Sequence, residues 1–395
     1  MTLFSRAGDT DGGGREAGPG AESESGDDRS RRPIRTRRDR RNITMNGPRH
    51  TNRRTALKTT AATLLGGSLL ARTAGASRVA PPGKARGRRN EVRITSEHDH
   101  DTGEHRFELS THEIASGWTT FEFDNRTEHT HFAYLPRIPE QALTDAEEMG
   151  MDPLELYVEA VTRPFQFFWD SQVDGKDPDP ADNTDIYDSL FPPWFGDVTF
   201  YGGPGLTSPG LTSETTVDLP PGEYIVECYV KDDANDFHSY LGMIDLLSVT
   251  DEESDAPEPE STLDLSLSTQ GVDVPAEVRP GRHTVAVKFE NQIEYSNLVG
   301  HDVHLVRLDD GTTVEDVNGW MNWADPTQFI SDGDDPTTFL GGVQDIWTAD
   351  LPRIGYFHAT LKPGDYAWVA EVPDPESEGL LTEFSVPDGR GRGRR

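Results

Sequence analysis

The stretch of sequence that decides the fold covers residues 221–249 and reads PGEYIVECYVKDDANDFHSYLGMIDLLSV. It contains two apolar runs, 224–230 and 244–249, and the first of them alternates apolar and polar side chains. A period of two is typical of half-buried β-strands. The Pro-Gly pair before the first run and the polar residues between the runs indicate turns. The stretch therefore predicts two strands joined by a long loop.

Runs of the same period recur in the rest of the chain. Residues 118–123 (WTTFEF) and 283–289 (HTVAVKF) alternate in this way, and Pro and Gly separate such runs at hairpin spacing. Residues 139–165 and 313–323 instead have apolar spacings that allow short helices. The chain is predicted to be all-β, with a short helical insertion in its first half.

Residues 263–388 repeat the order of landmarks in residues 77–250, and the acidic, Pro-containing linker 251–262 separates the two. The shared landmarks are the strand ends at Asn125 and Asn291, His-x5-Arg from His131 and His301, Phe-x-Gly-Gly from Phe200 and Phe339, and Leu-x-Pro-Gly-acid-Tyr from Leu219 and Leu361. Four landmarks in one order indicate an internal duplication. The strand density predicts two sandwiches of seven or eight strands in tandem.

Charge is distributed very unevenly along the 395 residues. The formal net charge is −33, but residues 94–389 hold 61 acidic and 12 basic residues, a net charge of −49. Such a charge repels itself in dilute buffer, whereas a Debye length of about 3 Å near 1 M salt screens it. Disorder is the alternative for acidic sequence, but here the acids alternate with apolar and aromatic residues. We expect a folded, salt-adapted surface that does not bind nucleic acid.

The ends of the chain show no core-forming pattern. Residues 1–44 are rich in Gly, Ser, Asp and Arg, and are expected to be disordered or a mis-assigned extension before Met45. Residues 45–76 resemble a twin-arginine signal peptide, with NRRTALK before a short apolar stretch. We expect export, a mature chain from Ser77, no transmembrane span, and at most a loose association with the cell surface. Residues 389–395 are expected to form a basic, disordered tail.

The first half contains side chains that bind soft and borderline metals. Cys228 is the only cysteine, so the chain can form no internal disulfide. His238 follows after nine residues and Met243 after four more, while His131 lies upstream on a predicted strand after Asn125. Two imidazoles, a thiolate and a weak axial thioether are the ligand set of a type 1 copper site.

In this order on a β-sandwich, these four residues resemble the cupredoxin family. The resemblance covers residues from about 91 to 249, and its most specific part is 222–249. It implies Greek-key sandwiches, one type 1 copper held by the four residues, and one-electron exchange with a redox protein partner. The chain departs from most small cupredoxins in its long, acidic Cys–His loop, which contains Asp232, Asp233 and Asp236.

Two functional interpretations stay open. In one, the chain is a copper-binding electron carrier; in the other, the same residues pack in a core, and the chain is a copper-free cell-surface binding or structural protein. A self-contained copper enzyme is not favoured. Nitrite reductases carry a catalytic-copper His directly before the type 1 Cys, where this chain has Glu227. No His-Cys-His motif accompanies the His-x-His pairs of the first half, His98 to His100 and His129 to His131.

Residues 263–388 lack the ligand set. Alignment of the two Pro-Gly-acid-Tyr motifs places Ala370 at the position of Cys228, and the segment that follows contains neither His nor Met. His301 and His304 alternate with apolar neighbours and are interpreted as ordinary strand residues. The second domain is therefore predicted to bind no copper and to have a structural or docking role.

Two further features have a structural and a functional interpretation. His98, His100 and His105 could hold a divalent ion, but a solvated arm and first strand is the favoured interpretation. The aromatic residues in 165–169 and 191–195 are expected to pack in the core or between domains. A docking patch for an electron-transfer partner is the alternative.

Overall fold

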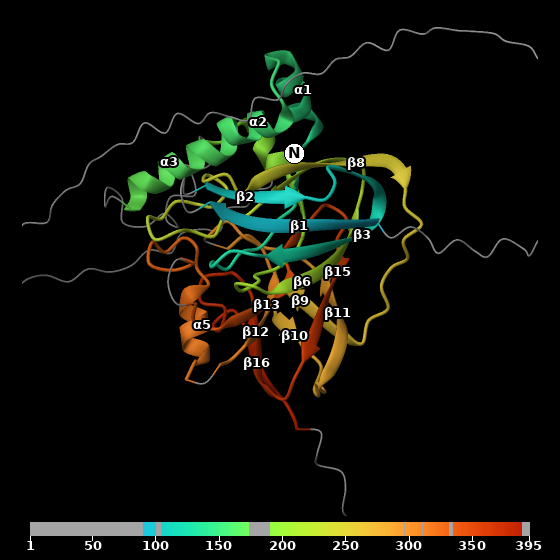
Figure 1. The fold of residues 1–395 in the computed structure, drawn as a ribbon, viewed down its shortest axis with the longest axis vertical. Coiled ribbons are helices and arrows are strands. Elements are labelled where there is room, and N and C mark those ends of the chain that lie inside the picture. The colour runs from blue at the N-terminus through green and yellow to red at the C-terminus, as the bar shows by residue number, and fades with distance from the viewer. Residues whose placement is uncertain are drawn as a thin grey trace, which may run out of the picture. The chain divides into compact units, whose positions relative to one another are not determined.

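The computed structural model describes residues 90–99, 104–173, 190–295, 297–309, 311–331 and 335–388. The predicted extension, signal peptide and basic tail lie outside these residues, as does His100. Strands dominate the described residues (Figure 1), so the predicted all-β, sandwich-like fold class is confirmed. Within the described ranges, no helix is long and apolar enough to cross a membrane.

The structure describes eight strands in the first half. They are β1 (Asn90–Asp99), β2 (Glu104–Leu109), β3 (Glu113–Asn125), β4 (Pro136–Arg137), β5 (Thr199–Tyr201), β6 (Thr212–Leu219), β7 (Gly222–Glu227) and β8 (Ile244–Glu253). Strand β1 forms a hairpin with β2 and pairs in parallel with β3, which pairs antiparallel with β6. The beginning of β3 pairs with β8, and β8 pairs with β7. Long β3 thus connects two sheets that enclose a core containing Phe121 and Phe123.

Nine strands are described in the second half. They are β9 (Leu263–Ser268), β10 (Gly271–Asp273), β11 (Gly281–Phe289), β12 (Val303–Arg307), β13 (Thr338–Val343), β14 (Ile346–Trp347), β15 (Arg353–Leu361), β16 (Gly364–Val369) and β17 (Leu381–Val386). Strands β9, β10, β11 and β15 pair in the same way as β1, β2, β3 and β6. The others form a separate sheet in the order β13-β12-β16-β17, except β14, which pairs with β5 of the first half.

One sheet runs from the first half into the second. Strand β6 pairs antiparallel with β15 through Thr216 opposite Tyr356, Thr215 opposite Phe357 and Glu214 opposite His358. The main hydrophobic core contains buried residues of both halves. The segment between β8 and β9 contains no helix or strand, and β8 itself continues to Glu253, three residues into the linker predicted from residue 251.

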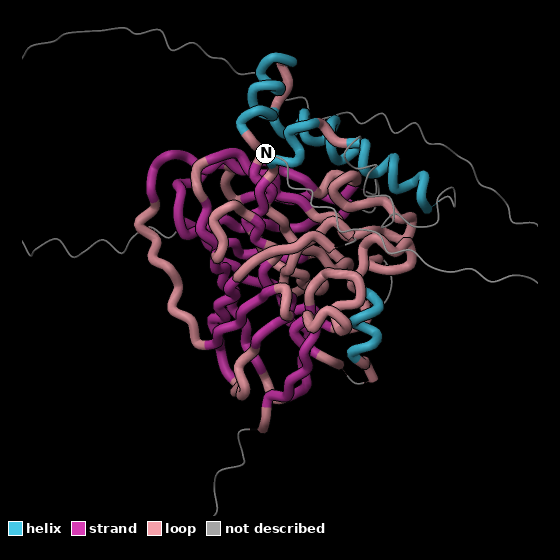
Figure 2. The backbone as a smooth tube through the Cα atoms, turned by 180° about the vertical axis from the view of Figure 1, so that it is seen from behind, coloured by secondary structure: helices cyan, strands magenta, loops and turns pink. Residues whose placement is uncertain are grey.

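Helices form a smaller part of the described residues than strands and loops (Figure 2). They are α1 (Glu140–Met149), α2 (Pro153–Tyr157), a π-helical turn (Val158–Thr162), α3 (Arg163–Ser171), a 3₁₀ turn (Pro193–Asp197) and α5 (Val314–Trp320). Both predicted helical segments are confirmed, and the first continues through the aromatic run. Within that run, Trp169 is fully buried and Phe165 contacts Phe237 and Trp323, so packing is its main role. Phe167 is the exception, because it is 60% exposed.

Candidate metal centre

Three of the four predicted ligands come together between the end of β7 and the beginning of β8. Cys228 directly follows β7 and Met243 directly precedes β8. The Cys228 N–H donates to the Met243 carbonyl at 3.2 Å, and the Met243 N–H donates to the His238 carbonyl at 2.8 Å. The antiparallel pairing of β7 with β8 therefore closes the loop that carries His238. Cys228 lies one residue beyond the regular strand on which the sequence placed it.

A buried asparagine positions the fourth ligand. Asn125, at the end of β3, donates its side-chain amide to the carbonyls of His129 and Thr207, each at 2.7 Å. His131 and Thr207 form an isolated antiparallel bridge, in which the Thr207 N–H donates to the His131 carbonyl at 2.8 Å. His131 was predicted to lie on a strand. Instead it is held by this single bridge, because the chain turns sharply after Asn125.

The side-chain donor atoms of three predicted ligands converge. Nδ1 of His131 and Nδ1 of His238 are 3.0 Å apart. Sγ of Cys228 lies 3.7 Å from the first of these nitrogens and 3.8 Å from the second. All four predicted ligands, including Met243, have exposed fractions of 0%. The arrangement is compact and closed to water.

The remaining ring nitrogens of the two histidines face hydroxyl groups. Nε2 of His131 lies 2.8 Å from Oγ1 of Thr127, and Nε2 of His238 lies 3.4 Å from Oγ of Ser331. Protons placed on both Nε2 atoms donate to these hydroxyls and leave two Nδ1 lone pairs directed at each other and at the sulfur. Such lone pairs repel one another unless a cation lies between them. The donor set therefore fits a copper ion.

Burial shifts the pKa of the titrating ligands. The pKa values of His131 and His238 lie well below the usual value, because burial disfavours the charged ring and neighbouring imidazoles add to this effect. Burial also raises the pKa of Cys228 to about 12. The imidazoles are therefore neutral near pH 7, as ligands must be, and the thiol keeps its proton until a metal ion displaces it.

Helix α3 anchors the long Cys–His loop. The buried side chain of Gln166 accepts from the Phe237 N–H at 2.8 Å and donates to the Asn235 carbonyl at 3.2 Å. Within the loop, one carboxylate oxygen of Asp232 accepts from the backbone N–H groups of Ala234 and Asp236. The acidic residues thus form a turn, which Gln166 fixes to the helical insertion.

The β1–β2 hairpin lies against the segment that follows this loop, between His238 and Met243. The His105 N–H donates to the Leu241 carbonyl at 3.3 Å. Gly242 has φ +114°, and a Cβ atom there would lie 2.7 Å from the His105 carbonyl oxygen. Glycine is needed at this position both for the backbone conformation and for the close approach of the hairpin.

The hairpin also places histidines beside the predicted ligands. The rings of His105 and His238 are stacked with centroids 4.4 Å apart, and His98 stacks on the other side at 4.3 Å from His105. His105 is only 3% exposed. The favoured prediction for His98 and His105 was a solvated arm and first strand. The strand is confirmed, but the solvated arm is wrong, because β1 and β2 turn these side chains toward the candidate metal centre. The sequence also gave no role to His129, whose ring lies 5.2 Å from that of His98.

The second half has the same backbone frame with different side chains. The Ala370 N–H donates to the Leu380 carbonyl at 3.1 Å, and the Leu380 N–H donates to the Pro375 carbonyl at 2.8 Å. These bonds match those made by Cys228, Met243 and His238. His301 is buried, and its Nδ1 lies 3.1 Å from the Asn291 carbonyl oxygen.

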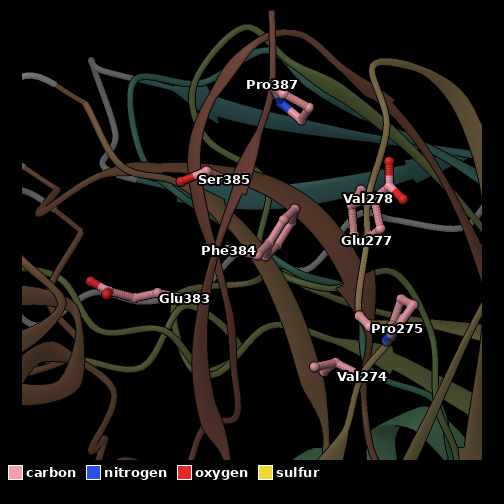
Figure 3. A pocket seen from close by; sticks show the side chains of 9 residues that line it. Val274, Pro275, Glu277, Val278, Glu383, Phe384, Ser385 and Pro387 are labelled. Atoms are coloured by element: carbon pink, nitrogen blue, oxygen red, sulfur yellow. The ribbon is translucent and has the colours of Figure 1, made fainter.

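A hollow of about 460 Å³ lies in the second half, between β17 and the segment after β10 (Figure 3). Val274, Glu277 and Phe384 are among its lining residues, and none of the four predicted ligands lines it. The candidate metal centre is therefore a closed cluster within the core, and the hollow has no part in it.

No protein-family model and no curated protein matches the sequence. Among solved structures, it is similar to auracyanin A, a "blue" copper protein from Chloroflexus aurantiacus, at 17% identity over 40% of this chain and 98% of that one, with a TM-score of 0.21. It is also similar to reduced auracyanin from Roseiflexus castenholzii (17% identity, 42% and 99% covered, TM-score 0.20) and to copper nitrite reductase from Nitrosomonas europaea (10% identity, 76% and 94% covered, TM-score 0.20). The fold class of this chain rests on the strand pairing described above.

Proposed function

We propose that this chain is an exported electron carrier that holds one type 1 copper ion through His131, Cys228, His238 and Met243. One observation carries the proposal: two Nδ1 atoms and the only thiol of the chain converge within 3.8 Å of one another at a fully buried site. The ligand types suit both oxidation states of copper, because the sulfur atoms favour Cu(I) and the imidazoles are common Cu(II) ligands.

A bound copper ion would supply reversible one-electron chemistry, and the protein would supply a rigid, dry set of ligands. The hydroxyls of Thr127 and Ser331 hold the two Nε2–H groups, which keeps both Nδ1 lone pairs directed inward. Fixed ligands move little when the charge on the metal changes, which favours fast electron transfer.

The second half would complete the first rather than bind copper. Ser331, which contacts His238, belongs to the second half, and its N–H donates to the Lys231 carbonyl at 3.0 Å. We therefore propose that residues 263–388 are a copper-free copy of the first domain, which supports the copper site by packing against it. The equivalent strand pairings and loop hydrogen bonds of the two halves support a duplication.

A redox protein is the proposed partner, and it would approach beside the metal loop. Phe167 is 60% exposed, and its ring lies 6.2 Å from that of Tyr240, a residue of the loop between His238 and Met243. A small apolar contact of this kind suits a transient electron-transfer complex. The acidic surface supports a salt-adapted, exported protein whose partner is not a nucleic acid.

A copper-free binding or structural protein is the competing function, and one observation favours it. The 3.0 Å contact between His131 and His238 can be an ordinary hydrogen bond if one Nδ1 carries a proton, and the thiol of Cys228 is protonated at neutral pH. The same residues would then only pack in the core.

Visible absorption and copper analysis of the mature chain in high salt distinguish the two functions. An electron carrier should bind copper with an intense blue charge-transfer band, and Cys228→Ser should abolish this band. Reduction and reoxidation should then occur in one-electron steps. A colourless protein that takes up no stoichiometric copper would leave the structural function.

A further inference from the structure

Three histidines outside the proposed copper ligands form a second cluster of possible metal ligands. His98 and His105 are directly opposite each other in the β1–β2 hairpin, and His129 lies in the turn after β3. One ligand nitrogen from each of the three can be chosen so that all lie within 4.8 Å of one another. Imidazole nitrogens at such distances are suited to bind one borderline divalent ion after small adjustments.

A carboxylate adjoins the same cluster. One oxygen of Glu128 lies 2.7 Å from Nδ1 of His98 and 3.2 Å from Nε2 of His129. Nδ1 of His129 lies 3.2 Å from the Ser331 carbonyl oxygen. A carbonyl oxygen can only accept a hydrogen bond, so this nitrogen is the donor and carries a proton. With the proton on Nδ1, the Nε2 lone pair of His129 is directed at the carboxylate of Glu128. The nitrogen and the oxygen are then both acceptors, and a cation between them would stabilise the pair.

Burial within the cluster decreases toward the surface. His105 is 3% exposed, and the side chains of His129, His98 and Glu128 are 9%, 15% and 46% exposed. The cluster is therefore mostly dry but reaches solvent at Glu128, which provides a route of entry for an ion. The proposed copper ligands, in contrast, are fully buried.

We propose that His98, His105 and His129, with the carboxylate of Glu128, bind a second metal ion of the Zn²⁺ or Cu²⁺ class. The ligands are nitrogen and oxygen atoms, so a copper ion bound here would lack the thiolate that gives a blue band. Because His105 stacks on His238, the two ions would be neighbours. Under the proposed function, the added positive charge should raise the reduction potential of the blue copper.

The second half shows that the fold does not require histidines in this hairpin. The Val272 N–H donates to the Gly379 carbonyl at 3.0 Å, much as the His105 N–H donates to Leu241. The β9–β10 hairpin is shorter, because it turns at residues 269–270. Its Leu267 pairs with Phe289 of β11 as Ile94 pairs with Phe123 of β3, so this hairpin ends before the positions that His98 and His105 occupy in the first half.

Zinc titration of the mature chain, followed by calorimetry and metal analysis, tests the second site. The copper-loaded wild type should bind one Zn²⁺ per chain. His98→Asn should weaken this binding by about 100-fold, and Glu128→Gln by about 10-fold, while both variants keep the blue band. His112→Asn is the matched control, because His112 is exposed and pairs with Asp245, and it should bind zinc like the wild type.

Cys228→Ser separates this proposal from the proposed function. If the blue site fails but the second site exists, Cys228→Ser should still bind zinc, and the further change His98→Asn should remove that binding. If neither His98→Asn nor Glu128→Gln changes zinc binding, the ion does not bind at this cluster and the proposal is overturned. The ion would then be bound by His131 and His238. Absence of stoichiometric zinc in every variant would overturn it as well. Glu128→Gln keeps the test valid if His98→Asn does not fold, because Glu128 is partly exposed.

Discussion

The metal loop of the first half and the matching loop of the second half share a backbone frame and differ in the side chains that they carry. Their matching residues are Cys228 and Ala370, His238 and Pro375, and Met243 and Leu380. Each pair is fixed by equivalent hydrogen bonds beside the last strands of its half. The frame therefore does not depend on the ligands, and the three side chains of the first loop are free to serve a chemical purpose.

The two halves also differ in the ionisable groups that they bury. The first half buries imidazoles and a thiol at the candidate centre, whereas the second half buries the carboxyl groups of Asp302, Asp345 and Glu371 together with the imidazoles of His301 and His304. Burial raises the pKa of Asp345 to about 7 and that of Glu371 well above its usual value. Asp345 and Glu371 therefore keep their protons to higher pH than exposed acids do, as does Glu227 of the first half, whose pKa burial raises to about 7.

The largest expected effect comes from making the first loop resemble the second. Cys228→Ala should abolish the blue band, because the thiolate is lost. Loss of a residue that only supports a ligand weakens metal binding by about 10- to 100-fold, so loss of the ligand itself should weaken copper binding by more. Copper titration followed by absorption measures both. Ala370→Cys is the matched control: it adds a thiol beside Pro375 and Leu380, which supply no ligand, so it should create no second blue site. A second band from Ala370→Cys would contradict the comparison.

The next effect concerns the pH dependence of stability. The folded-state pKa of Asp345, about 7, lies above its ordinary value of 3.8, so the folded protein binds this proton more tightly than the unfolded chain. The free energy of unfolding should therefore fall as the pH rises from about 4 to about 7, by up to about 4 kcal/mol. Asp345→Asn should make this slope shallower. Burial also raises the pKa values of Glu227, Asp236 and Glu371, so these groups keep a slope of the same sign.

Urea unfolding at constant high salt, measured across the same pH range, checks this expectation. Asp251→Asn, which changes an exposed carboxyl group, should keep the slope of the wild type. An unchanged slope in Asp345→Asn would show that this carboxyl group is not the one that titrates.

A smaller effect is expected at the glycines before Met243 and Leu380. Gly242→Ala should cost about 2–4 kcal/mol, because it adds a contact of 2.7 Å with the His105 carbonyl to the strain of φ +114°. Gly379→Ala has φ +69° and an ordinary contact at 3.6 Å, so it should cost only about 1–2 kcal/mol. Chemical denaturation measures both, and equal costs would argue against the close packing of the β1–β2 hairpin.

The smallest expected effect is that of Met243→Leu, which copies Leu380. The thioether is a weak axial ligand, so this variant should stay blue and lose less than about 1.4 kcal/mol of copper-binding free energy, or tenfold in affinity. Its reduction potential should rise, because loss of a ligand and a more apolar site favour Cu(I). Voltammetry beside a copper titration tests both points. Loss of the blue colour would show that Met243 has a stronger role.

Local sequence patterns were sufficient to predict the strands and the residues of the candidate centre. Alternation identified β3, β7 and β11, the apolar run 244–249 identified β8, and residue type with spacing selected Cys228, His238 and Met243. These features depend on neighbours along the chain, since two antiparallel strands close one loop. His131 is more distant, but it was found through its position after Asn125.

Contacts between distant segments could not be predicted in this way. The pairing of His98 with His105 depends on the register of β1 and β2, and alternation alone does not reveal a register. Ser331 contacts His129 from 202 residues away, and no local pattern indicates that contact. The His-x-His pair at 129 and 131 was a usable signal, but its two side chains belong to different clusters.

The pairing of β6 with β15 has a consequence for solubility. Within its own half, each strand would be the outermost member of its sheet, with a row of unpaired N–H and C=O groups. Such edges recruit strands from other molecules and lead to aggregation. Here each edge covers the other, so a first domain produced alone would expose β6 together with the apolar surface that the second half now buries. The second half thus contributes to solubility by covering this edge.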